Sequence, residues 1–333
     1  MDIRLPYLIF LGSVVAVRDA KTGLGVRDWR PEACAGQWRL AGCAVDLGLP
    51  DLEPAAALAA GARSLLIGVA PVGGQIRPEW VPALVAALTA GLDIVSGMHT
   101  RLGSVPELAA AAVRHGRQLI DVRHADQRFP VGTGVKRPGK RLLTVGTDCA
   151  LGKKYTALAL TRAFIAASHD ASFRATGQTG IMISGGGIAI DAVVADFVAG
   201  AAESLSPANA PDHWDIIEGQ GSLVHPGYAA VSLGLLHGSQ PDVLVLCHDP
   251  ARLEIDEYPG FAIPPLGEVM DLHLALARRT NPAARFGGIA LDTSALDVAA
   301  AVRLLGEHEA RHGVTCFDPL RSDLARVVAG LVG

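Results

Sequence analysis

A glycine-rich loop between a predicted strand and a predicted helix constrains the fold of this chain most. Residues 139–156 contain an apolar run, then this loop, then the start of a helix whose apolar residues recur on one face. The glycines let backbone N–H groups face an anion, and the helix N-terminus and Lys153 add positive charge. We therefore expect the loop to bind a phosphate group, the alternative being a tight turn with an incidental lysine. The predicted cofactor-binding residues here are Gly146, Thr147, Asp148, Cys149, Ala150, Leu151, Gly152, Lys153 and Lys154.

Lys154 follows the loop lysine, at the position where an ordinary P-loop NTPase has the serine or threonine that ligates Mg²⁺. A second ammonium group attracts phosphate and repels a metal ion, so the pattern favours an anchored phosphate over metal-assisted nucleotide hydrolysis. Cys149 lies beside two lysines and a helix N-terminus, conditions that lower the pKa of a thiol. It is either a nucleophile that accepts an acyl group or a small residue of the loop.

Carboxylates and glycine-rich segments follow other predicted strands of the second half. Glu218 ends the strand Trp214–Ile217 and is the first candidate for a general base, or else for a metal-facing acid or a solvated cap. Asp191 is a second candidate base. Asp292 and Asp318 end two later strands, where they either recognise a nucleotide base or cap a turn. The residues predicted to line the substrate site in this half are Gly177, Gln178, Thr179, Gly180, Gln220, Gly221 and Ser222.

The first half of the chain alternates buried strands with helical segments, which predicts a Rossmann-like parallel sheet. We expect strands near residues 7–17, 64–69, 92–96 and 118–122, and helices near residues 79–89 and 105–115. His99 and Arg101 follow one of these strands. They either hold a substrate carboxylate, act as acid and base, or are ordinary surface residues.

The second half reads as a P-loop domain of the same α/β class. Further strands are expected near residues 141–145, 172–176, 214–217, 243–247, 288–291 and 314–317. Residues 129–140 collect Pro, Gly and Lys without periodicity and form the best linker candidate. We therefore predict a Rossmann-like domain over residues 1–138 and a P-loop domain over residues 139–333.

Composition narrows the classes of partner. Lys and Arg number 29 against 33 Asp and Glu, a net charge of −4 without blocks of like charge, so nucleic acid is not expected as a partner. The apolar runs are far shorter than the ~20 residues that cross a bilayer, and no signal peptide is evident, so we expect a cytoplasmic protein without a membrane partner. The five cysteines and eleven histidines lack metal-ligand spacing. We predict no metal site, and cysteines that are mostly small core residues.

Five segments resemble the D-glutamate N-acetyltransferase-like family, long catalogued as a domain of unknown function. They are GVAPVGGQIRPEW and GLDIVSGMH in the first half, and VGTDCALGKKYTALAL, ATGQTGIMISGGGIAIDAVVADFVAGAAE and EGQGSLVHPGY in the second. The resemblance covers nearly the full chain and implies an N-terminal Rossmann-like domain and a C-terminal P-loop domain. The phosphate loop of that family does not require Ser or Thr after the lysine. The P-loop half also resembles dethiobiotin synthetase, in which a threonine stands where this chain has Lys154 and an asparagine stands where it has Asp292.

The resemblance implies an N-acetyltransferase that moves an acetyl group from acetyl-CoA to the amine of D-glutamate or a similar small amino acid. In that reaction the loop grips a phosphate of CoA, Glu218 or Asp191 deprotonates the attacking amine, and Arg101, Arg174 or Arg252 holds an acidic substrate. One alternative is a ligase or kinase that uses ATP and Mg²⁺, and another is a non-catalytic nucleotide or metabolite sensor. Because enzymes with this type of P-loop commonly pair across the site, a homo-oligomer is expected.

Overall fold

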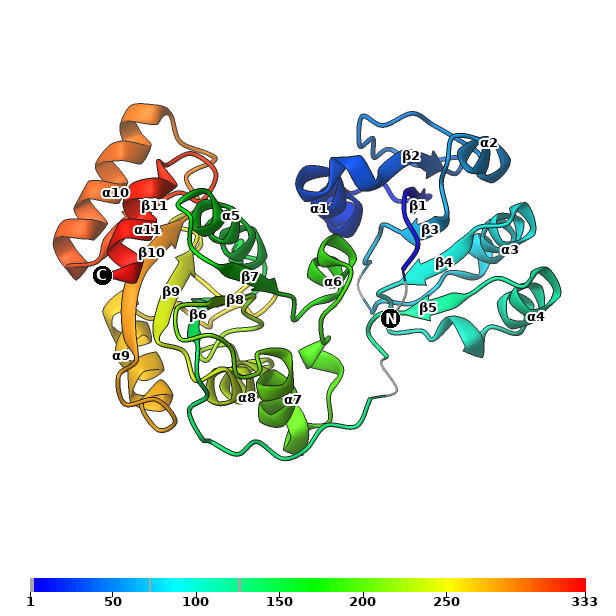
Figure 1. The fold of residues 1–333 in the computed structure, drawn as a ribbon. Coiled ribbons are helices and arrows are strands. Elements are labelled where there is room, and N and C mark those ends of the chain that lie inside the picture. The colour runs from blue at the N-terminus through cyan, green and yellow to red at the C-terminus, as the bar shows by residue number, and fades with distance from the viewer. Residues whose placement is uncertain (1–2, 72, 125–126) are drawn as a thin grey trace. The chain divides into compact units, whose positions relative to one another are not determined.

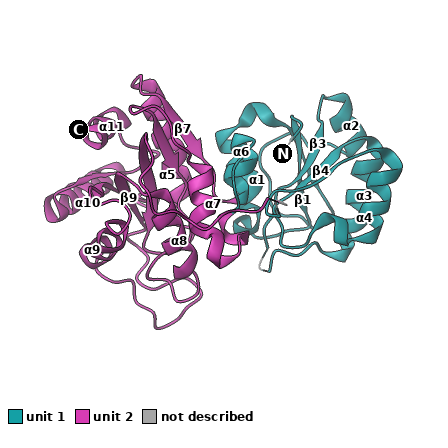
Figure 2. Ribbon diagram, turned by 60° about the horizontal axis from the view of Figure 1, so that its bottom comes forward, with its two compact units in different colours: residues 1–126, 178–189 teal, residues 127–177, 190–333 magenta. Residues whose placement is uncertain are grey.

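The computed structural model describes residues 3–71, 73–124 and 127–333, and the chain divides into two compact units (Figure 1). Unit 1 comprises residues 1–126 and 178–189, and unit 2 comprises residues 127–177 and 190–333 (Figure 2). Each unit contains one sheet whose neighbouring strands are parallel. The predicted α/β class is confirmed.

The sheet of unit 1 has the strand order β2-β1-β3-β4-β5, which is a doubly wound, Rossmann-like arrangement. Its strands are Tyr7–Gly12 (β1), Cys34–Arg39 (β2), Ser64–Ile67 (β3), Asp93–Ser96 (β4) and Leu119–Asp121 (β5). The helices of the first half are Lys21–Trp29 (α1), Pro54–Ala59 (α2), Val81–Ala90 (α3) and Pro106–His115 (α4). Every residue of β1, β3 and β4, the inner strands of the sheet, is buried, as expected for a parallel sheet covered on both faces.

Helix α6 (Gln178–Ser184) belongs to unit 1, although it lies in the second half of the sequence. It packs against α1, and the hydroxyl of Tyr7 donates a hydrogen bond of 3.1 Å to the carbonyl of Met182. Arg30 Nη1 donates to the carbonyl of Ile183 at 2.7 Å. A segment that follows the second strand of the P-loop half therefore completes the core of unit 1.

The sheet of unit 2 has the order β11-β10-β9-β6-β8-β7. Its strands are Lys140–Gly146 (β6), Ala171–Arg174 (β7), Trp214–Ile217 (β8), Val243–His248 (β9), Arg285–Leu291 (β10) and Thr315–Phe317 (β11). Its helices are Lys153–Ala166 (α5), Val198–Leu205 (α7), Ala229–Ser239 (α8), Leu266–Ala277 (α9), Val298–His312 (α10) and Leu324–Val332 (α11). Strands β7 and β8 lie on one side of β6, and β9, β10 and β11 lie on the other. The end of β6 is therefore a topological switch point, where sheets of this kind bind ligands.

Helix α5 holds the loop against the sheet through its apolar face. Ala157, Leu160 and Phe164 are fully buried, as the helical spacing predicts. The ring of Phe164 meets the ring of Trp214 edge to face, with 5.2 Å between centroids. The start of α5 is thus fixed by core packing several turns away from the loop.

Some expectations need correction. Strand β1 ends at Gly12 and not near residue 17, and β2, α1 and α2 were not predicted. Cys247 and Cys316 are buried, but Cys34, Cys43 and Cys149 are only partly buried, so the expectation of mostly core cysteines is wrong.

The domain boundary at residue 139 stays a prediction, because a division by compactness does not test which segments fold independently. Unit 2 as described begins at residue 127, within a segment without helix or strand that continues to the start of β6. Among the described residues, none of the helices combines the length and the apolar character needed to cross a bilayer.

Candidate functional site

The phosphate loop connects β6 to α5, and its backbone takes a conformation that is unusual for residues with side chains. Ala150 has φ +54° and Gly152 has φ +84°, both in the left-handed region. For Ala150 this conformation costs about 1–2 kcal/mol, a strain that is typical of functional loops. The strand, loop and helix start predicted from the sequence are confirmed.

Lys153 places its ammonium group inside the loop. Its side chain is 6% exposed, and Nζ donates a hydrogen bond of 2.6 Å to the backbone carbonyl of Asp148. Burial lowers the pKa of Lys153, and no carboxylate of the described residues forms an ion pair with it. The Lys153 side chain also passes over Gly219, where a Cβ atom would lie 1.8 Å from the carbonyl oxygen of Thr144, so no other residue fits at position 219. The loop therefore contains a desolvated cation that an anion would stabilise.

Asp148 is fully buried and connects the loop to residues that follow β9. Its Oδ1 accepts from the N–H of Cys149 at 2.5 Å, and its Oδ2 accepts from Arg252 Nη1 and from the N–H of Asp256, both at 2.9 Å. Burial raises the pKa of this carboxyl, but the hydrogen bonds from Asp256, Arg252 and Cys149 outweigh it and hold the pKa below its usual value. Asp148 is thus a structural carboxylate of the loop, ionised at neutral pH.

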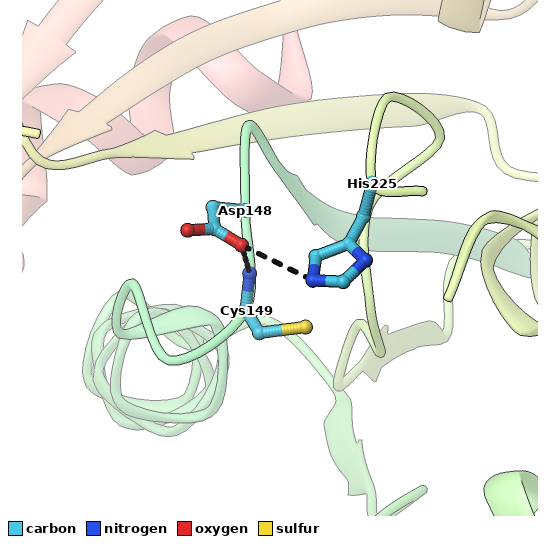
Figure 3. A group of neighbouring side chains, drawn as sticks. All are labelled: Asp148, Cys149 and His225. Atoms are coloured by element: carbon cyan, nitrogen blue, oxygen red, sulfur yellow. Dashed lines mark hydrogen bonds and ion pairs between the residues drawn. The ribbon is translucent and has the colours of Figure 1, made fainter. Parts of the chain in front are cut away.

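His225 lies beside Asp148 and was not among the predicted site residues. The side chain is 2% exposed, and Nδ1 accepts hydrogen bonds from the N–H groups of Gly227 at 3.0 Å and Tyr228 at 3.2 Å. Because Nδ1 accepts, Nε2 of the neutral ring carries the proton. Nε2 lies 3.8 Å from Asp148 Oδ1 (Figure 3). The ring contacts the rings of Tyr228 and Tyr258, with centroid distances of 4.5 and 4.8 Å.

Asp148, Cys149 and His225 bring one oxygen, one sulfur and one nitrogen within 4.8 Å of one another, a spacing that could hold a metal ion (Figure 3). The hydrogen bonds do not fit this role. Nδ1 of His225 faces two N–H donors, which leaves its Nε2 protonated and without a lone pair, and both oxygens of Asp148 already accept N–H groups. That no metal binds here stays a prediction.

Glu218 is buried at the end of β8 and holds the segment that follows β7. Its Oε2 accepts from the N–H groups of Thr176 at 3.0 Å and Gly177 at 3.1 Å. Gln220 Nε2 donates to Thr176 Oγ1 at 3.0 Å. Burial raises the pKa of Glu218, opposed first by the positive charge of Lys154. A carboxyl with a raised pKa suits a general base, but the two N–H donors also give Glu218 a structural role.

The remaining site residues predicted near Glu218 and the phosphate loop differ in how exposed they are. Gly221 has φ +60°, and Ser222 is buried, with its Oγ accepting from the N–H of Val224. With Gly146 and Gln220 they line a cavity of about 10 Å³, room for one water molecule and too small for a substrate. Lys154 is partly exposed, with Nζ 5.2 Å from the centre of the Tyr155 ring.

Three residues predicted to line the P-loop site belong to unit 1. Gln178, Thr179 and Gly180 form the first turn of α6, whereas Gly177 belongs to unit 2. Gln178 Oε1 accepts a hydrogen bond from Arg123, and Thr179 Oγ1 donates to Thr22 Oγ1 at 3.3 Å. This helix was not predicted from the sequence, and the chain enters unit 1 between residues 177 and 178. That Gln178, Thr179 and Gly180 line the substrate site stays a prediction.

His99 and Arg101 are exposed after β4, at the carboxyl edge of the sheet in unit 1, as predicted. Partial desolvation of the ring is the main cause that lowers the pKa of His99, followed by the charge of Arg123. The GVAPVGG segment approaches the same edge of the sheet. Its Val72 lies outside the described residues.

Several candidates have structural partners. Asp292 is exposed and accepts from the N–H of Ser294, and Asp318 accepts from the N–H and hydroxyl of Thr293. Arg174 Nε donates to Asp215 at 2.6 Å. Asp191 is exposed in the 3-10 turn Ile190–Ala192. The capping alternative is therefore observed for Asp292 and Asp318, whereas a role of any of these residues toward a ligand stays a prediction.

Comparison with known proteins matches both halves of the chain. Residues 38–125 match a Rossmann-like domain, and residues 130–328 a P-loop domain, of the family catalogued as DUF1611, a domain of unknown function. A DUF1611 family protein from Anabaena variabilis, with a crystal structure at 2.30 Å, superposes with a TM-score of 0.88 at 34% identity, covering 99% of this chain and 100% of that one.

Two relatives carry the name D-glutamate N-acetyltransferase. One, from Tritonibacter scottomollicae, is 48% identical over 329 residues, 99% of each chain. The other, from a Pseudoalteromonas species, is 44% identical over 331 residues, 99% of this chain and 100% of its own.

Fold and site therefore define an α/β protein with a Rossmann-like domain followed by a P-loop domain. The chain belongs to the DUF1611 family, the D-glutamate N-acetyltransferase-like family that the sequence motifs resemble. It is an N-acetyltransferase enzyme.

Proposed function

We propose that this N-acetyltransferase moves the acetyl group of acetyl-CoA to the amine of D-glutamate or a similar small amino acid. The observation that carries the proposal is the identity of 44–48%, over nearly the full chain, to two proteins with the name D-glutamate N-acetyltransferase. The choice of CoA as donor and of an acidic D-amino acid as acceptor goes beyond that likeness.

The phosphate loop supports a donor that carries phosphate groups but needs no metal. The buried ammonium of Lys153 and the N-terminus of α5 converge on the loop, a combination that binds phosphate. Lys154 supplies a second cation where a nucleotide hydrolase needs a hydroxyl for Mg²⁺. In this proposal the loop anchors a phosphate of CoA.

Glu218 supports the proposal as the residue that deprotonates the attacking amine. Its burial and raised pKa are the properties that a general base needs near neutral pH. Among the candidate cations for an acidic acceptor, Arg174 forms an ion pair with Asp215 and Arg252 forms one with Asp148.

The direct test measures release of the CoA thiol when the purified chain is mixed with acetyl-CoA and D-glutamate, with L-glutamate in a parallel reaction. We expect thiol release that depends on the D-amino acid, and N-acetyl-D-glutamate as the product in mass spectrometry. Lys153→Ala should lower kcat/KM for acetyl-CoA at least about 10-fold, because a hydrogen bond to a charged group contributes about 1.5–3 kcal/mol. Lys21→Ala removes an exposed lysine and serves as the matched control.

Two results would contradict the proposal. One is formation of ADP from ATP that requires both Mg²⁺ and a carboxylate substrate, which would indicate a ligase or kinase. The other is tight binding of CoA or nucleotide without turnover in either assay, as expected for a sensor.

A further inference from the structure

Cys149 stands inside the phosphate loop, and no step of the proposed reaction has yet used it. It is partly buried, and Arg252 Nη1 donates to its backbone carbonyl at 2.9 Å. Its thiol points toward His225 and lies on the Nε2 side of the ring (Figure 3). The sulfur, a ring nitrogen of His225 and a carboxylate oxygen of Asp148 lie within 4.8 Å of one another.

His225 is the second observation that points to a ligand at this place. The side chain is 2% exposed, and the two N–H donors at Nδ1 leave the proton on Nε2. Among the described residues, the hydrogen bonds of the His225 ring are both at Nδ1, and Nε2 lies 3.8 Å from the carboxylate oxygen of Asp148. A ligand atom or a charged sulfur at this position can accept a hydrogen bond from Nε2.

The surroundings of the thiol are electropositive. Lys153 donates to the carbonyl of Asp148, the residue before Cys149, and α5 begins four residues after Cys149. A buried ammonium, a helix N-terminus and an N–H donor all stabilise a thiolate over a thiol. Asp148, the one negative group of the cluster, is turned to Arg252 and to backbone N–H groups.

We propose that Cys149 accepts the acetyl group from acetyl-CoA before it passes to the amino acid, with His225 as the N–H donor to the reacting thioester. This inference rests on the proposed function, and it adds a covalent acetyl-cysteine enzyme to it. Cys149 is then a catalytic residue, and the hydrogen-bonded Nε2–H of His225 stabilises the oxyanion or the thiolate.

Each half of this reaction is a balanced acyl transfer. In the first half a bond forms between Cys149 Sγ and the acetyl carbon, the bond from that carbon to the CoA sulfur breaks, and the thiol proton of Cys149 ends on CoA. In the second half the neutral amine attacks the acetyl carbon and the bond to Sγ breaks. The proton that the amine nitrogen loses ends on Cys149.

The test incubates the full chain with acetyl-CoA alone, quenches with acid and measures the intact mass and the peptide map. We expect one acetyl group per chain on the peptide that contains Cys149, and loss of that group when D-glutamate is added before the quench. Cys149→Ala should show no acetylation and a loss of turnover of at least about 100-fold. Cys43→Ala removes another partly buried thiol, located in unit 1, and should behave as the wild type.

A pair of variants tests His225. His225→Asn retains an oxygen that can accept from Gly227 and Tyr228 but lacks a donor at the Nε2 position, whereas His225→Gln places an amide N–H there. We expect the acetylation rate of Cys149 to fall about 100-fold in His225→Asn, the usual effect of removing one oxyanion donor. His225→Gln should restore part of that rate, which a merely structural role would not produce.

The results separate this inference from the proposed function. Turnover in Cys149→Ala at the wild-type rate, or no acetyl-cysteine in the wild type while D-glutamate is acetylated, overturns the acetyl-cysteine step and leaves the N-acetyltransferase proposal intact. Acetylation of Cys149 that is never discharged by any amino acid supports the step and contradicts the proposed acceptor.

Discussion

Glu218 shows how one residue can serve both the local structure and the chemistry. Its carboxylate holds the N–H groups of Thr176 and Gly177, and its burial raises the energy of the charged form. Because its charge is desolvated, a buried carboxylate is a stronger base. The same desolvated charge lowers the stability of the folded protein.

We predict that Glu218→Gln folds normally and loses activity. The glutamine oxygen can still accept the two backbone N–H groups, and the neutral amide removes the cost of a desolvated charge. Because the pKa of Glu218 is raised in the folded state, that state binds the proton more firmly than the unfolded chain. The glutamate therefore costs stability as the pH rises above about 4.3, the usual value.

The measurement compares Tm across pH 4–8 with turnover for the same protein. At neutral pH the Tm of Glu218→Gln should equal or exceed that of the wild type, while kcat falls about 100-fold or more. A variant with wild-type kcat would show that Glu218 is structural only.

Local pattern explains which site residues could be predicted. The phosphate loop is contiguous, so its glycines and Lys153 indicated the site directly. Asp148 was included as a loop member, but its contacts to Arg252 and Asp256 join segments about a hundred residues apart. His225 was missed because neither its tautomer nor its position beside Cys149 follows from local spacing.

Helix α6 is the element that sequence reasoning placed least well. Its glycine-rich start, following β7, is typical of a loop at a site, and only the tertiary contacts to Tyr7, Arg30 and Thr22 show that it packs on α1. Most of the buried strands were predicted within a few residues because both faces are covered, whereas the predicted end of β1 was too late. The edge strand β2 was missed, since four of its six residues are only partly buried and the run contains polar residues.

We predict that the packing of α6 contributes directly to the stability of unit 1. Ile181 is fully buried in α6, and Ile181→Ala should lower the free energy of unfolding by about 2–4 kcal/mol through lost burial and a cavity. Ile165→Ala is the matched control, because Ile165 is 57% exposed in α5 and its removal should change stability by about 0.5 kcal/mol or less. Urea denaturation of both variants measures the difference, and equal effects would rule out a stabilising role for α6.

At the scale of the whole molecule, two buried histidines make the stability depend on pH. Burial lowers the pKa of His248 and of His273 to about 4. The unfolded chain therefore binds protons more strongly at these two histidines than the folded chain does. The folded state is consequently destabilised as the pH falls from about 6.5 toward about 4, and the full free energy of unfolding is retained above about pH 6.5.

His273→Leu should reduce that pH dependence. We expect the free energy of unfolding to fall between pH 6.5 and pH 4 by about 2–3 kcal/mol less in the variant than in the wild type. Urea denaturation at several pH values measures both slopes, and identical slopes would show that His273 is not protonated preferentially on unfolding.

Because residues 178–189 return to unit 1, the polypeptide passes from one unit to the other at three points along its length. Two genes fused end to end would give a single crossing. A recombination event that exchanged the first 126 residues for an unrelated domain would separate α6 from the strand and helix on which it packs. We therefore expect the two units to be inherited together, and substitutions in α1 and β1 to be matched over evolution by substitutions in α6.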